Sequence, residues 1–369
     1  MLVSIILVSF FGLITLIQLY YILRYYWRLA ITALPKPIQQ AQLPVSIIIA
    51  ARNESENLQK YLDSILQQDY PNYEVIVVND CSYDHSTDLL KGFKTRYTHL
   101  KVVEIVEDDR FRHGKKFAIT LGIKSAQHEH LLFTDADCMP VSKNWLNDMQ
   151  SFFDEKEIVL GYSPFEKSKG LLNRIARYEN FQTALNYLSF ALKNNPYMGV
   201  GRNLAYKKSL FFQHKGFASH MHLQSGDDDL FVNQAATKSN VAVCLTADSI
   251  VYTPAKTTWS GYFRQKLRHY GVGSEYKKSN RISISMQSIS GMLFYVLGIT
   301  LACLNILPLY VAGIAALRIL PLMVIYFKAM KRLQVKDLYW TWILQDLIFY
   351  LFIPFWSILV VFSSKKRWN

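Results

Sequence analysis

The chain has 369 residues, 51% of them hydrophobic, and this length can form a full core in one large domain or two smaller ones. Its formal net charge of +13 would suit nucleic acid, but the basic residues cluster beside apolar segments, at 264–268, 277–281, 328–336 and 365–367. Attraction to anionic lipid headgroups explains this placement better, so we expect a membrane partner and no nucleic acid. Four widely separated cysteines form no C-x-x-C pair, which argues against a zinc site or a disulfide framework and indicates reduced thiols in a cytoplasmic domain.

The N-terminal segment has the features of a membrane anchor. Residues 1–23 contain no charged side chain, and Leu2–Leu23 is long enough to cross the hydrocarbon core of a bilayer. Aromatic and basic residues follow at 24–28, and the segment lacks the basic n-region and the small-residue cleavage site of a signal peptide. We therefore predict an anchor at 1–29 whose C-terminal end is cytoplasmic, followed by a proline-punctuated linker at 30–44.

Strands and helices alternate after the linker. Four continuous apolar runs rich in Val and Ile predict strands at 45–50, 74–78, 101–105 and 130–133. Helical patterns lie between them, at 55–68, 86–95 and 115–125. This order predicts an α/β fold with a parallel sheet that is covered by helices on both faces.

Polar residues stand where the predicted strands end. The first strand is followed by Arg52, Asn53 and Glu54, the second by Asn79 and Asp80, and the fourth by Asp135 and Asp137. Any one of them alone is explained as an ordinary turn or capping residue. Ligands of such sheets bind beyond the carboxyl ends of the strands, so several acids at one rim predict a binding site there.

The alternation weakens after Pro140. Residues 171–192 predict a long amphipathic helix, either packed near the membrane surface or an ordinary helix of the domain. Residues 199–203 predict a flexible turn, and three consecutive acids at 227–229 precede a further helical run. A helix N-cap with acids in its first turn would explain this triplet without a catalytic role.

The C-terminal third resembles a membrane domain. Residues 282–317 are uncharged and too long for one span, and a break at 305–308 predicts spans near 287–305 and 309–327. The basic segment 328–336 would then face the cytoplasm, whereas residues 339–362 fit a further span, an interfacial helix or a re-entrant pair broken near Pro354. Arg318 falls within a predicted span, where Asp346 is one candidate partner and snorkelling is the alternative.

The motif Thr134-Asp135-Ala136-Asp137 places two carboxylates at the end of a buried strand. In an extended chain, side chains two residues apart point the same way, so Asp135 and Asp137 are expected to face one ligand. Neighbouring carboxylates repel unless a cation lies between them, and a hard divalent ion leaves coordination positions for the oxygens of a diphosphate. A D-x-D spacing occurs in many chains, so its position after the fourth strand is what makes it informative.

These motifs, in this order, resemble the membrane-anchored members of glycosyltransferase family 2, which have the GT-A fold. The resemblance covers about residues 44–280. Residues 44–54 look like the family's first strand and nucleotide loop, residues 74–80 like its second strand, and residues 114–122 like the segment before its metal site. The resemblance implies that Asp135 and Asp137 bind Mg²⁺ or Mn²⁺. It also implies a set of donor-binding residues: Ala50, Arg52, Glu54, Asp80, Lys115, Asp135, Gln265 and Arg268.

The downstream motifs are similar to the family's with two departures. Asp227 takes the place of the general base, but Gly226 stands where a glutamate is usual, so Asp227 and Asp228 both stay candidates. Residues 265–269 resemble the Q-x-x-R-W motif with His269 in place of tryptophan, which weakens the inference of a channel that threads a polymer. The residues implied on the acceptor side are Gly201, Arg202, Asn203 and His269.

The resemblance implies a multi-pass protein of the cell membrane with a cytoplasmic, Rossmann-like GT-A domain at 45–280 and a membrane region of two to four segments at 281–369. It would be an inverting glycosyltransferase that moves a sugar from a UDP- or GDP-linked donor to a lipid or glycan acceptor. The divalent cation with Lys115 or Arg268 would stabilise the departing diphosphate, and Asp227 would accept the proton of the acceptor hydroxyl. Two alternatives stay open: a processive polysaccharide synthase, and a non-catalytic scaffold that binds a nucleotide sugar.

Overall fold

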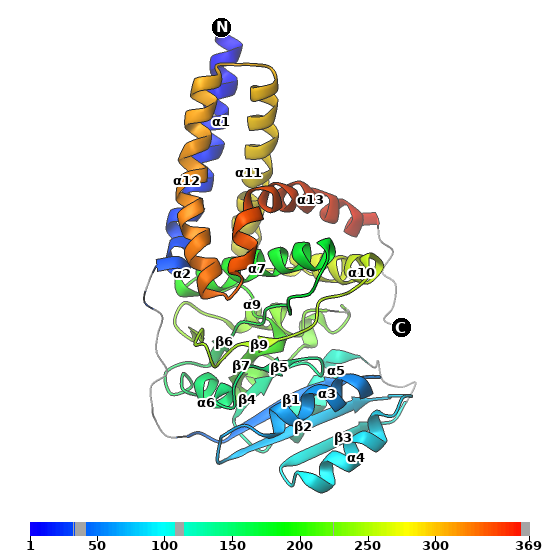
Figure 1. Ribbon diagram of the computed structural model, residues 1–369. Coiled ribbons are helices and arrows are strands. Elements are labelled where there is room, and N and C mark those ends of the chain that lie inside the picture. The colour runs from blue at the N-terminus through cyan, green and yellow to red at the C-terminus, as the bar shows by residue number, and fades with distance from the viewer. Residues whose placement is uncertain (32, 34–41, 108–113, 224, 363–369) are drawn as a thin grey trace. The chain divides into compact units, whose positions relative to one another are not determined.

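The computed structural model describes the whole chain except residues 32, 34–41, 108–113, 224 and 363–369 (Figure 1). Contacts divide it into two compact units. Of the described residues, 1–31, 33, 167–193 and 256–362 belong to the helical unit, and 42–107, 114–166, 194–223 and 225–255 belong to the α/β unit. The domain boundaries expected after residues 29, 44 and 280 stay predictions, and most of the expected linker lies outside the described residues.

The first half of the α/β unit forms the predicted parallel strands. β1 (Val45–Ala51), β2 (Tyr73–Asp80), β3 (Leu100–Ile105) and β4 (His130–Phe133) lie in the order β3-β2-β1-β4, all parallel. β1, β2 and β4 are runs of mostly buried residues, as expected for strands that have helices on both faces, whereas β3, at the edge of the sheet, buries only Leu100 and Ile105.

The second half of the sheet is not parallel throughout, so the expectation of a parallel sheet is wrong beyond β4. β7 (Leu204–Lys207) pairs antiparallel with both β4 and β6 (Ile158–Leu160), and β8 (Val241–Val243) closes the edge parallel to β6. A separate antiparallel pair joins β5 (Met139–Pro140) to β9 (Val251–Tyr252). Strands β5 to β9 are two to four residues long, and such short runs carry no periodic signal from which a direction could be predicted.

Helices cover both faces of the sheet, since successive side chains of a strand point to opposite faces. α3 (Ser55–Leu66) contributes to the core that contains Ile47 and Ile49. α5 (Lys115–Ser125) packs on the other face, where a Cβ atom on Gly122 would lie 2.7 Å from Ile48. Gly122 therefore permits the close approach of α5 to the sheet. The other helices of the unit are α4 (Ser86–Arg96), α6 (Trp145–Gln150), α8 (Lys208–Gln213) and α9 (Asp229–Ala235).

In the helical unit, three long apolar stretches lie side by side (Figure 1). The first runs from α1 (Leu2–Tyr21) through a π-helical turn, η1 (Ile22–Tyr26), into α2 (Trp27–Ile31), and the others are α11 (Lys278–Cys303) and α12 (Pro308–Arg332). Within the described residues, these three are long and apolar enough to cross a membrane. The predicted break is confirmed, because Asn305 and Leu307 turn the chain with φ angles of 52° and 43°.

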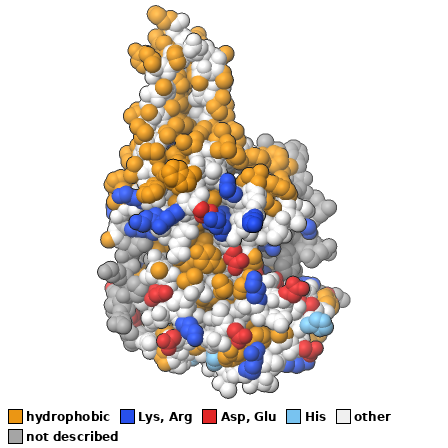
Figure 2. Space-filling model, in the orientation of Figure 1, with side chains coloured by type: hydrophobic (Ala, Val, Ile, Leu, Met, Phe, Trp, Pro, Cys, Tyr) orange, Lys and Arg blue, Asp and Glu red, His pale blue; other side chains and the backbone are white. Residues whose placement is uncertain are grey.

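The surface of these helices is polarised along their length. Apolar side chains cover it, and Lys and Arg side chains gather near one end (Figure 2). The turns at the ends of η1, α2 and α12 carry Arg24, Arg28, Lys331 and Arg332. This is the pattern of helices whose basic ends lie at a membrane surface.

Three further helices run across the long ones: α7 (Leu171–Leu192), α10 (Trp259–Tyr270) and α13 (Trp342–Phe362) (Figure 1). Short 3₁₀ turns, η4 (Gly273–Glu275) and η5 (Lys336–Thr341), lead into α11 and α13. α13 is continuous through residue 354, so it is not a re-entrant pair. α13 runs across the long helices, which is the course expected of the interfacial helix that was one of the alternatives for residues 339–362.

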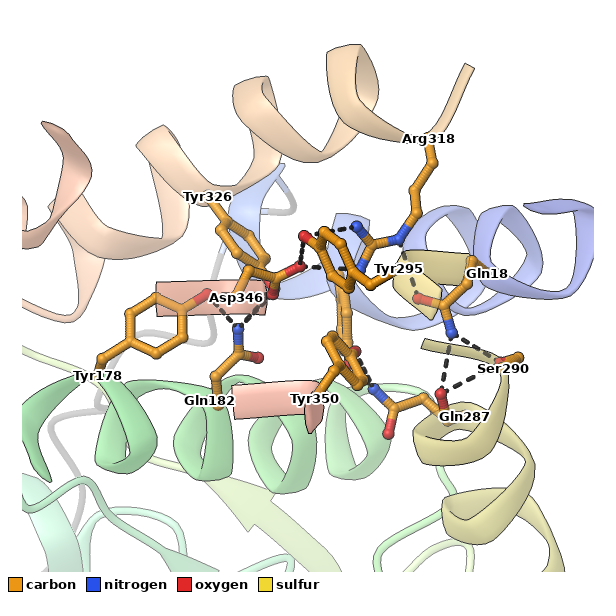
Figure 3. Close-up of polar contacts among 11 residues, drawn as sticks. Gln18, Tyr178, Gln182, Gln287, Ser290, Tyr295, Arg318, Tyr326, Asp346 and Tyr350 are labelled. Carbon is orange, nitrogen blue, oxygen red and sulfur yellow. Dashed lines mark hydrogen bonds and ion pairs between the residues drawn. The ribbon is translucent and has the colours of Figure 1, made fainter. Parts of the chain in front are cut away.

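Arg318 of α12 and Asp346 of α13 form the ion pair that was one of the two sequence-based alternatives (Figure 3). Arg318 Nη2 lies 2.9 Å from Asp346 Oδ2, and the two side chains are 1% and 0% exposed. The arginine also donates to Gln18 of α1 over 3.1 Å. Further hydrogen bonds reach the carboxylate from α7, α11 and α12, donated by Tyr178, Gln182, Tyr295 and Tyr326. The buried charge is thus fully paired, which is the condition for keeping it inside an apolar bundle.

Candidate active site

A small pocket in the α/β unit lies at the carboxyl ends of β1 and β4. Four apolar or aromatic side chains, Ile48, Ile119, Phe133 and Tyr206, form part of its wall. Polar groups converge on it from separate segments: Lys115 from α5, Thr134 and Asp135 after β4, and Gly201, Asp227 and Asp228 before β7 and α9. Ala50 also lines it. The acidic side chains of Asp135, Asp227 and Asp228 therefore lie together beyond the carboxyl ends of the strands, at the edge of the sheet where a binding site was predicted.

Asp135 and Asp137 lie close together, but for a different reason from the one expected. β4 ends at Phe133, and the motif forms a tight turn in which Cys138 N donates to Asp135 O over 3.2 Å. One ligand atom each of Asp135, Asp137 and Cys138 lies within 4.8 Å of the other two. Burial raises the pKa of the Cys138 thiol, which keeps it protonated. The carboxylate oxygens alone therefore suit a hard divalent ion such as Mg²⁺ or Mn²⁺.

Lys115 connects the D-x-D turn to the acidic triplet. Its Nζ lies 2.9 Å from Asp135 Oδ1 and 3.2 Å from Asp227 Oδ2. Burial alone would lower the pKa of Lys115, but the carboxylates of Asp135, Asp227 and Asp228 raise it, so the side chain is charged. An ammonium group thus balances carboxylates from two distant segments in one pocket.

Asp227 and Asp228 differ in how their carboxylates are used. Both oxygens of Asp228 accept backbone hydrogen bonds, from Gly201 N over 2.7 Å and from Asp229 N over 2.8 Å, and Asp228 is the N-cap of α9. Burial, followed by the charge of Asp227, raises the pKa of Asp228. Asp227, in contrast, is paired with the Lys115 side chain and lines the pocket. Asp228 thus caps α9, whereas Asp227 lines the pocket beside Lys115, and which of the two acts as a base stays a prediction.

Gly226 has a backbone that a glutamate would adopt only with strain. Its φ of +102° lies in the region that favours glycine, and a Cβ atom would lie 2.5 Å from Leu230 Cδ1. Glycine in place of the family's glutamate therefore fits the local turn at residue 226, and the next residue, Asp227, lines the pocket.

Two positioning contacts were not anticipated from the sequence. Lys116 is buried and donates to the carbonyls of His220 and Leu223 over 2.6 and 3.2 Å, which holds the loop before the acidic triplet. Burial, then the charge of Lys116, lowers the pKa of His220 to about 4, so its ring is neutral at pH 7. Thr134 donates to Arg202 O over 3.0 Å. The two adjacent lysines were visible in the sequence, but only the fold shows that Lys115 contacts carboxylates of the pocket whereas Lys116 binds backbone carbonyls of a loop.

The residues assigned to the nucleotide lie on the same rim. Asp80 is the last residue of β2 and is buried, and Arg52 follows β1 half-buried. Glu54 precedes α3 and accepts a hydrogen bond from Asn57 over 2.5 Å. Asn53, with a φ of 55°, accepts from Tyr83 N over 2.8 Å and ties this loop to the end of β2. Their contact with a nucleotide stays a prediction.

The expected acceptor-side residues fall in two places. Gly201, Arg202 and Asn203 form a 3₁₀ turn before β7, where Gly201 lines the pocket. Asn203 is fully buried and binds Trp145 and the carbonyls of two other residues, so its side chain supports the turn. His269 lies on α10 of the helical unit together with the donor candidates Gln265 and Arg268. The roles of these six residues stay predictions.

The fold is an α/β domain of the GT-A class. Among solved structures, the mannosyltransferase PcManGT from Pyrobaculum calidifontis, in complex with GDP-Man and Mn²⁺, has a TM-score of 0.57 with this chain. The similarity covers 94% of this chain and 99% of that one, at 17% sequence identity. At this identity it establishes the fold.

Residues 46–218 match the model of Glycosyl transferase family 2, and the chain therefore carries a domain of this family. Glycosyltransferase AglE of Haloferax volcanii is 38% identical over 104 residues, which are 28% of this chain and 33% of the relative. Poly-beta-1,6-N-acetyl-D-glucosamine synthase of Staphylococcus epidermidis is 36% identical over 93 residues, which are 25% of this chain and 21% of the relative. The chain thus matches a third or less of the length of these relatives.

Proposed function

We propose that the chain transfers a sugar from a nucleoside diphosphate sugar to a lipid or lipid-linked acceptor, with inversion at the anomeric carbon and with a divalent cation as cofactor. The observation that carries this proposal is the pocket beyond β1 and β4, in which Lys115 joins Asp135 of the D-x-D turn to Asp227 of the acidic triplet. Transfer of a sugar from a diphosphate oxygen to an acceptor oxygen needs positive charge at the departing diphosphate and a base at the acceptor hydroxyl. Lys115 contacts the residues proposed for both tasks.

The donor side of the proposal depends on the D-x-D turn. The oxygens of Asp135 and Asp137 fit Mg²⁺ or Mn²⁺, and such an ion would supply positive charge to the departing diphosphate when bound. PcManGT, which shares the fold, was solved with GDP-Man and Mn²⁺, which supports this class of donor and cofactor. Lys115 holds a second positive charge in the same pocket and would bind the diphosphate oxygens.

The acceptor side depends on Asp227. Its carboxylate accepts the proton of the acceptor hydroxyl while the hydroxyl oxygen forms a bond to the anomeric carbon. The bond from this carbon to the diphosphate oxygen breaks on the opposite side, and the nucleoside diphosphate leaves. Direct displacement inverts the configuration and needs no covalent sugar–protein intermediate.

A membrane location supports a lipid or lipid-linked acceptor. α2 ends at Ile31, before the α/β unit begins, and α11 begins at Lys278, after it ends. Both ends carry basic residues, Arg28 in α2 and Lys278 with Arg281 at the start of α11. The positive-inside rule therefore favours a cytoplasmic α/β unit.

The test compares transfer by the wild-type full-length protein with that by Asp137→Ala and Asp227→Asn. Each purified protein is incubated with labelled UDP- and GDP-sugars, Mg²⁺ or Mn²⁺, and a lipid extract of membranes. We expect the wild type to label lipid with one donor, and both variants to lose transfer at least about 100-fold while they keep their unfolding temperature.

Asp88→Asn is the matched control, because Asp88 is an exposed acid paired with Lys91 on α4, away from the pocket. It should transfer sugar at the wild-type rate. Full transfer by both pocket variants would contradict the mechanism.

A processive polysaccharide synthase is the second candidate, favoured by the similarity to the poly-N-acetylglucosamine synthase. The length of the product decides between them: one sugar on each acceptor supports the proposal, and a polymer supports the synthase. A scaffold without catalysis would release no nucleotide from any donor.

A further inference from the structure

The end of α7 packs against the first apolar stretch of the helical unit through stacked aromatic rings. The ring centre of Tyr25 in η1 lies 3.9 Å from that of Phe190 in α7, and the two ring planes differ by 10°. Beside this stack, the Tyr26 hydroxyl donates to Asn186 Oδ1 over 3.0 Å. All three rings are buried. A close stack and a hydrogen bond one turn away fix how these two segments meet.

These contacts bring three cationic side chains together. Lys193 follows Phe190 by three residues, which is about one helical turn. Arg24 precedes Tyr25, and Arg28 follows it by three residues. The positive charges of Arg28 and then of Arg24 lower the pKa of Lys193. Like charges repel, so this arrangement costs free energy unless an anion compensates it.

The described part of the helical unit supplies no such anion. None of the three cations forms an ion pair with a carboxylate of the described residues. Arg332 of α12 is a further cation of this region, but its Nη1 donates to Leu29 O over 2.5 Å. Arg332 is thus engaged within the unit, whereas the charges of the other three have no described counter-charge.

The helix dipole explains only part of this arrangement. A cation is stabilised at the C-terminal end of a helix, and Lys193 is the C-cap of α7. Arg24 has no such position, because the chain stays helical from Leu2 through η1 to Ile31. The dipole also gives no reason for cations of two segments to converge. A bound anion accounts for all three.

The face of the first apolar stretch that carries Arg24 is otherwise apolar and aromatic. Four residues spaced by three and four lie on it, and all are exposed: Tyr20, Leu23, Arg24 and Trp27. Aromatic and aliphatic side chains next to a cation are typical of a helix at the boundary between lipid and water. An anion that fits both parts of this face has an acyl chain.

A phosphate group is the anion that suits these cations best. Arginine binds phosphate oxygens through two parallel N–H donors, and lysine adds a point charge. The Lys and Arg side chains of this unit gather near one end of its apolar surface (Figure 2). A soluble phosphate compound would use the cations but leave the apolar face in water, whereas a lipid covers both.

We propose that Arg24, Arg28 and Lys193 form a binding site for the phosphate headgroup of an anionic membrane lipid. The acyl chains of this lipid lie along the exposed face that contains Leu23. The headgroup cancels the repulsion among the cations and so stabilises the contact between α7 and the first apolar stretch. The lipid is a bound partner and not the acceptor of the sugar, so this inference does not rest on the proposed function.

The experiment measures lipid binding to the full-length protein in detergent by native mass spectrometry. The cluster variant carries Arg24→Gln, Arg28→Gln and Lys193→Gln, which keep polar side chains but remove three charges. We expect the wild type to retain phosphatidylglycerol, and the cluster variant to bind it at least about tenfold more weakly. Phosphatidylcholine, which has no net charge, should bind to the wild type as weakly as phosphatidylglycerol binds to the cluster variant.

The matched control carries Lys328→Gln, Lys331→Gln and Lys336→Gln, at three exposed lysines in α12 and η5. It removes the same charge from the helical unit but leaves the cluster intact. Its affinity for phosphatidylglycerol should therefore change less than about twofold. Inorganic phosphate in excess should not displace the lipid from the wild type, because phosphate has no acyl chain.

Thermal unfolding without added lipid separates binding from folding. The cluster variant should unfold at a temperature no lower than that of the control variant, because the repulsion among its cations is gone. A lower temperature would show that the cations stabilise the protein itself, and would overturn the proposal.

Three binding results would overturn it as well. Wild-type affinity in the cluster variant would show that these side chains bind no lipid. An equal loss in the control variant would show a general attraction to positive charge, and displacement by inorganic phosphate would show a site for the free anion. None of these results depends on whether the chain transfers a sugar.

Discussion

Lys115 is the residue on which the charge balance of the pocket depends. Its ammonium group lies within 3.2 Å of carboxylates that come from residues 135 and 227, more than 90 positions apart in the chain. A diphosphate and its cation would bind to the same groups. We therefore expect Lys115 to leave at least one carboxylate when the donor binds, since the metal then takes over its electrostatic role.

Replacement of Lys115 by methionine tests this role. The side chain keeps its length, but Asp135 and Asp227 lose their counter-charge and repel. We expect the unfolding free energy to fall by about 1–2 kcal/mol, less than for a fully buried pair because Lys115 and Asp135 are 31% and 29% exposed. Mn²⁺ should then stabilise the variant more than the wild type.

Thermal unfolding with and without Mn²⁺ measures both effects. Lys124→Met, at the exposed end of the same helix, is the control and should behave as the wild type. An equal rise of the unfolding temperature with Mn²⁺ in wild type and Lys115→Met would show that the ion does not compete for these carboxylates.

At the scale of elements, one carboxylate joins the starts of two helices of the α/β unit. Asp84 accepts hydrogen bonds from Ser55 N at the first residue of α3, over 2.9 Å, and from Ser86 N at the first residue of α4, over 3.0 Å. Burial would raise the pKa of Asp84, but these hydrogen bonds outweigh it and lower the pKa to about 2. A carboxylate at a helix N-terminus also interacts favourably with the helix dipole.

Asp84→Asn should therefore destabilise the protein in a pH-dependent way. Because the folded pKa lies below the unfolded value of about 3.9, the contribution is present above pH 4 and is lost as the pH falls toward 2. We expect a loss of about 1 kcal/mol at pH 7 and a shrinking difference from the wild type below pH 4. Urea unfolding of the detergent-solubilised protein across this range measures it, and a difference that is constant with pH would refute the explanation.

A buried ion pair connects α12 to α13 in the helical unit. Asp346 is completely buried and accepts hydrogen bonds from the Arg318 guanidinium and from four other side chains (Figure 3). Removal of one partner from such a pair leaves a buried charge without compensation, which is far more costly than loss of the pair as a whole.

Asp346→Asn should accordingly reduce both the yield in membranes and the unfolding temperature. By this reasoning the loss is about 3–5 kcal/mol, whereas the double variant Arg318→Met/Asp346→Leu should recover most of it because no charge remains. Quantification of the membrane fraction and thermal unfolding in detergent provide the measurements. Unchanged yield together with unchanged thermal stability in Asp346→Asn would show that the ion pair does not stabilise the helical unit.

At the scale of the whole molecule, the chain passes repeatedly between its two units. Residues 167–193, which contain α7, leave the α/β unit after Glu166 and return to it at Asn194, shortly before the turn at Gly201. The same element thus belongs by its contacts to the helical unit and is connected at both ends to the α/β unit.

The proposed topology predicts which residues are accessible from each side of the membrane. In a variant without Cys81 and Cys303, a cysteine in place of Leu304, between α11 and α12, should react with an impermeant maleimide in intact cells. A cysteine in place of Lys238, in an exposed turn of the α/β unit, should react only after permeabilisation. The reverse pattern of labelling would place the α/β unit on the outer face.

Much of the architecture was predictable because it is encoded locally. The four parallel strands, the helices between them and the break between two long apolar helices follow from runs and periods within a few tens of residues. The D-x-D motif was informative for the same reason, since its position at a strand end places it at the binding rim. The antiparallel β7 was not predictable, because a four-residue strand carries no signal for its neighbours.

The composition and order of the residues already determined an apolar region at each end, an α/β domain between them and a rim of acids beyond its strands. The tertiary structure decided how these acids are used: Asp228 caps α9, whereas Asp227 shares Lys115 with Asp135. It likewise selected Asp346 as the partner of Arg318 and Glu179 as that of Lys266. Local patterns follow from neighbours along the chain, but the partner of a charged side chain depends on which distant segments the packed core brings within a few ångströms of it.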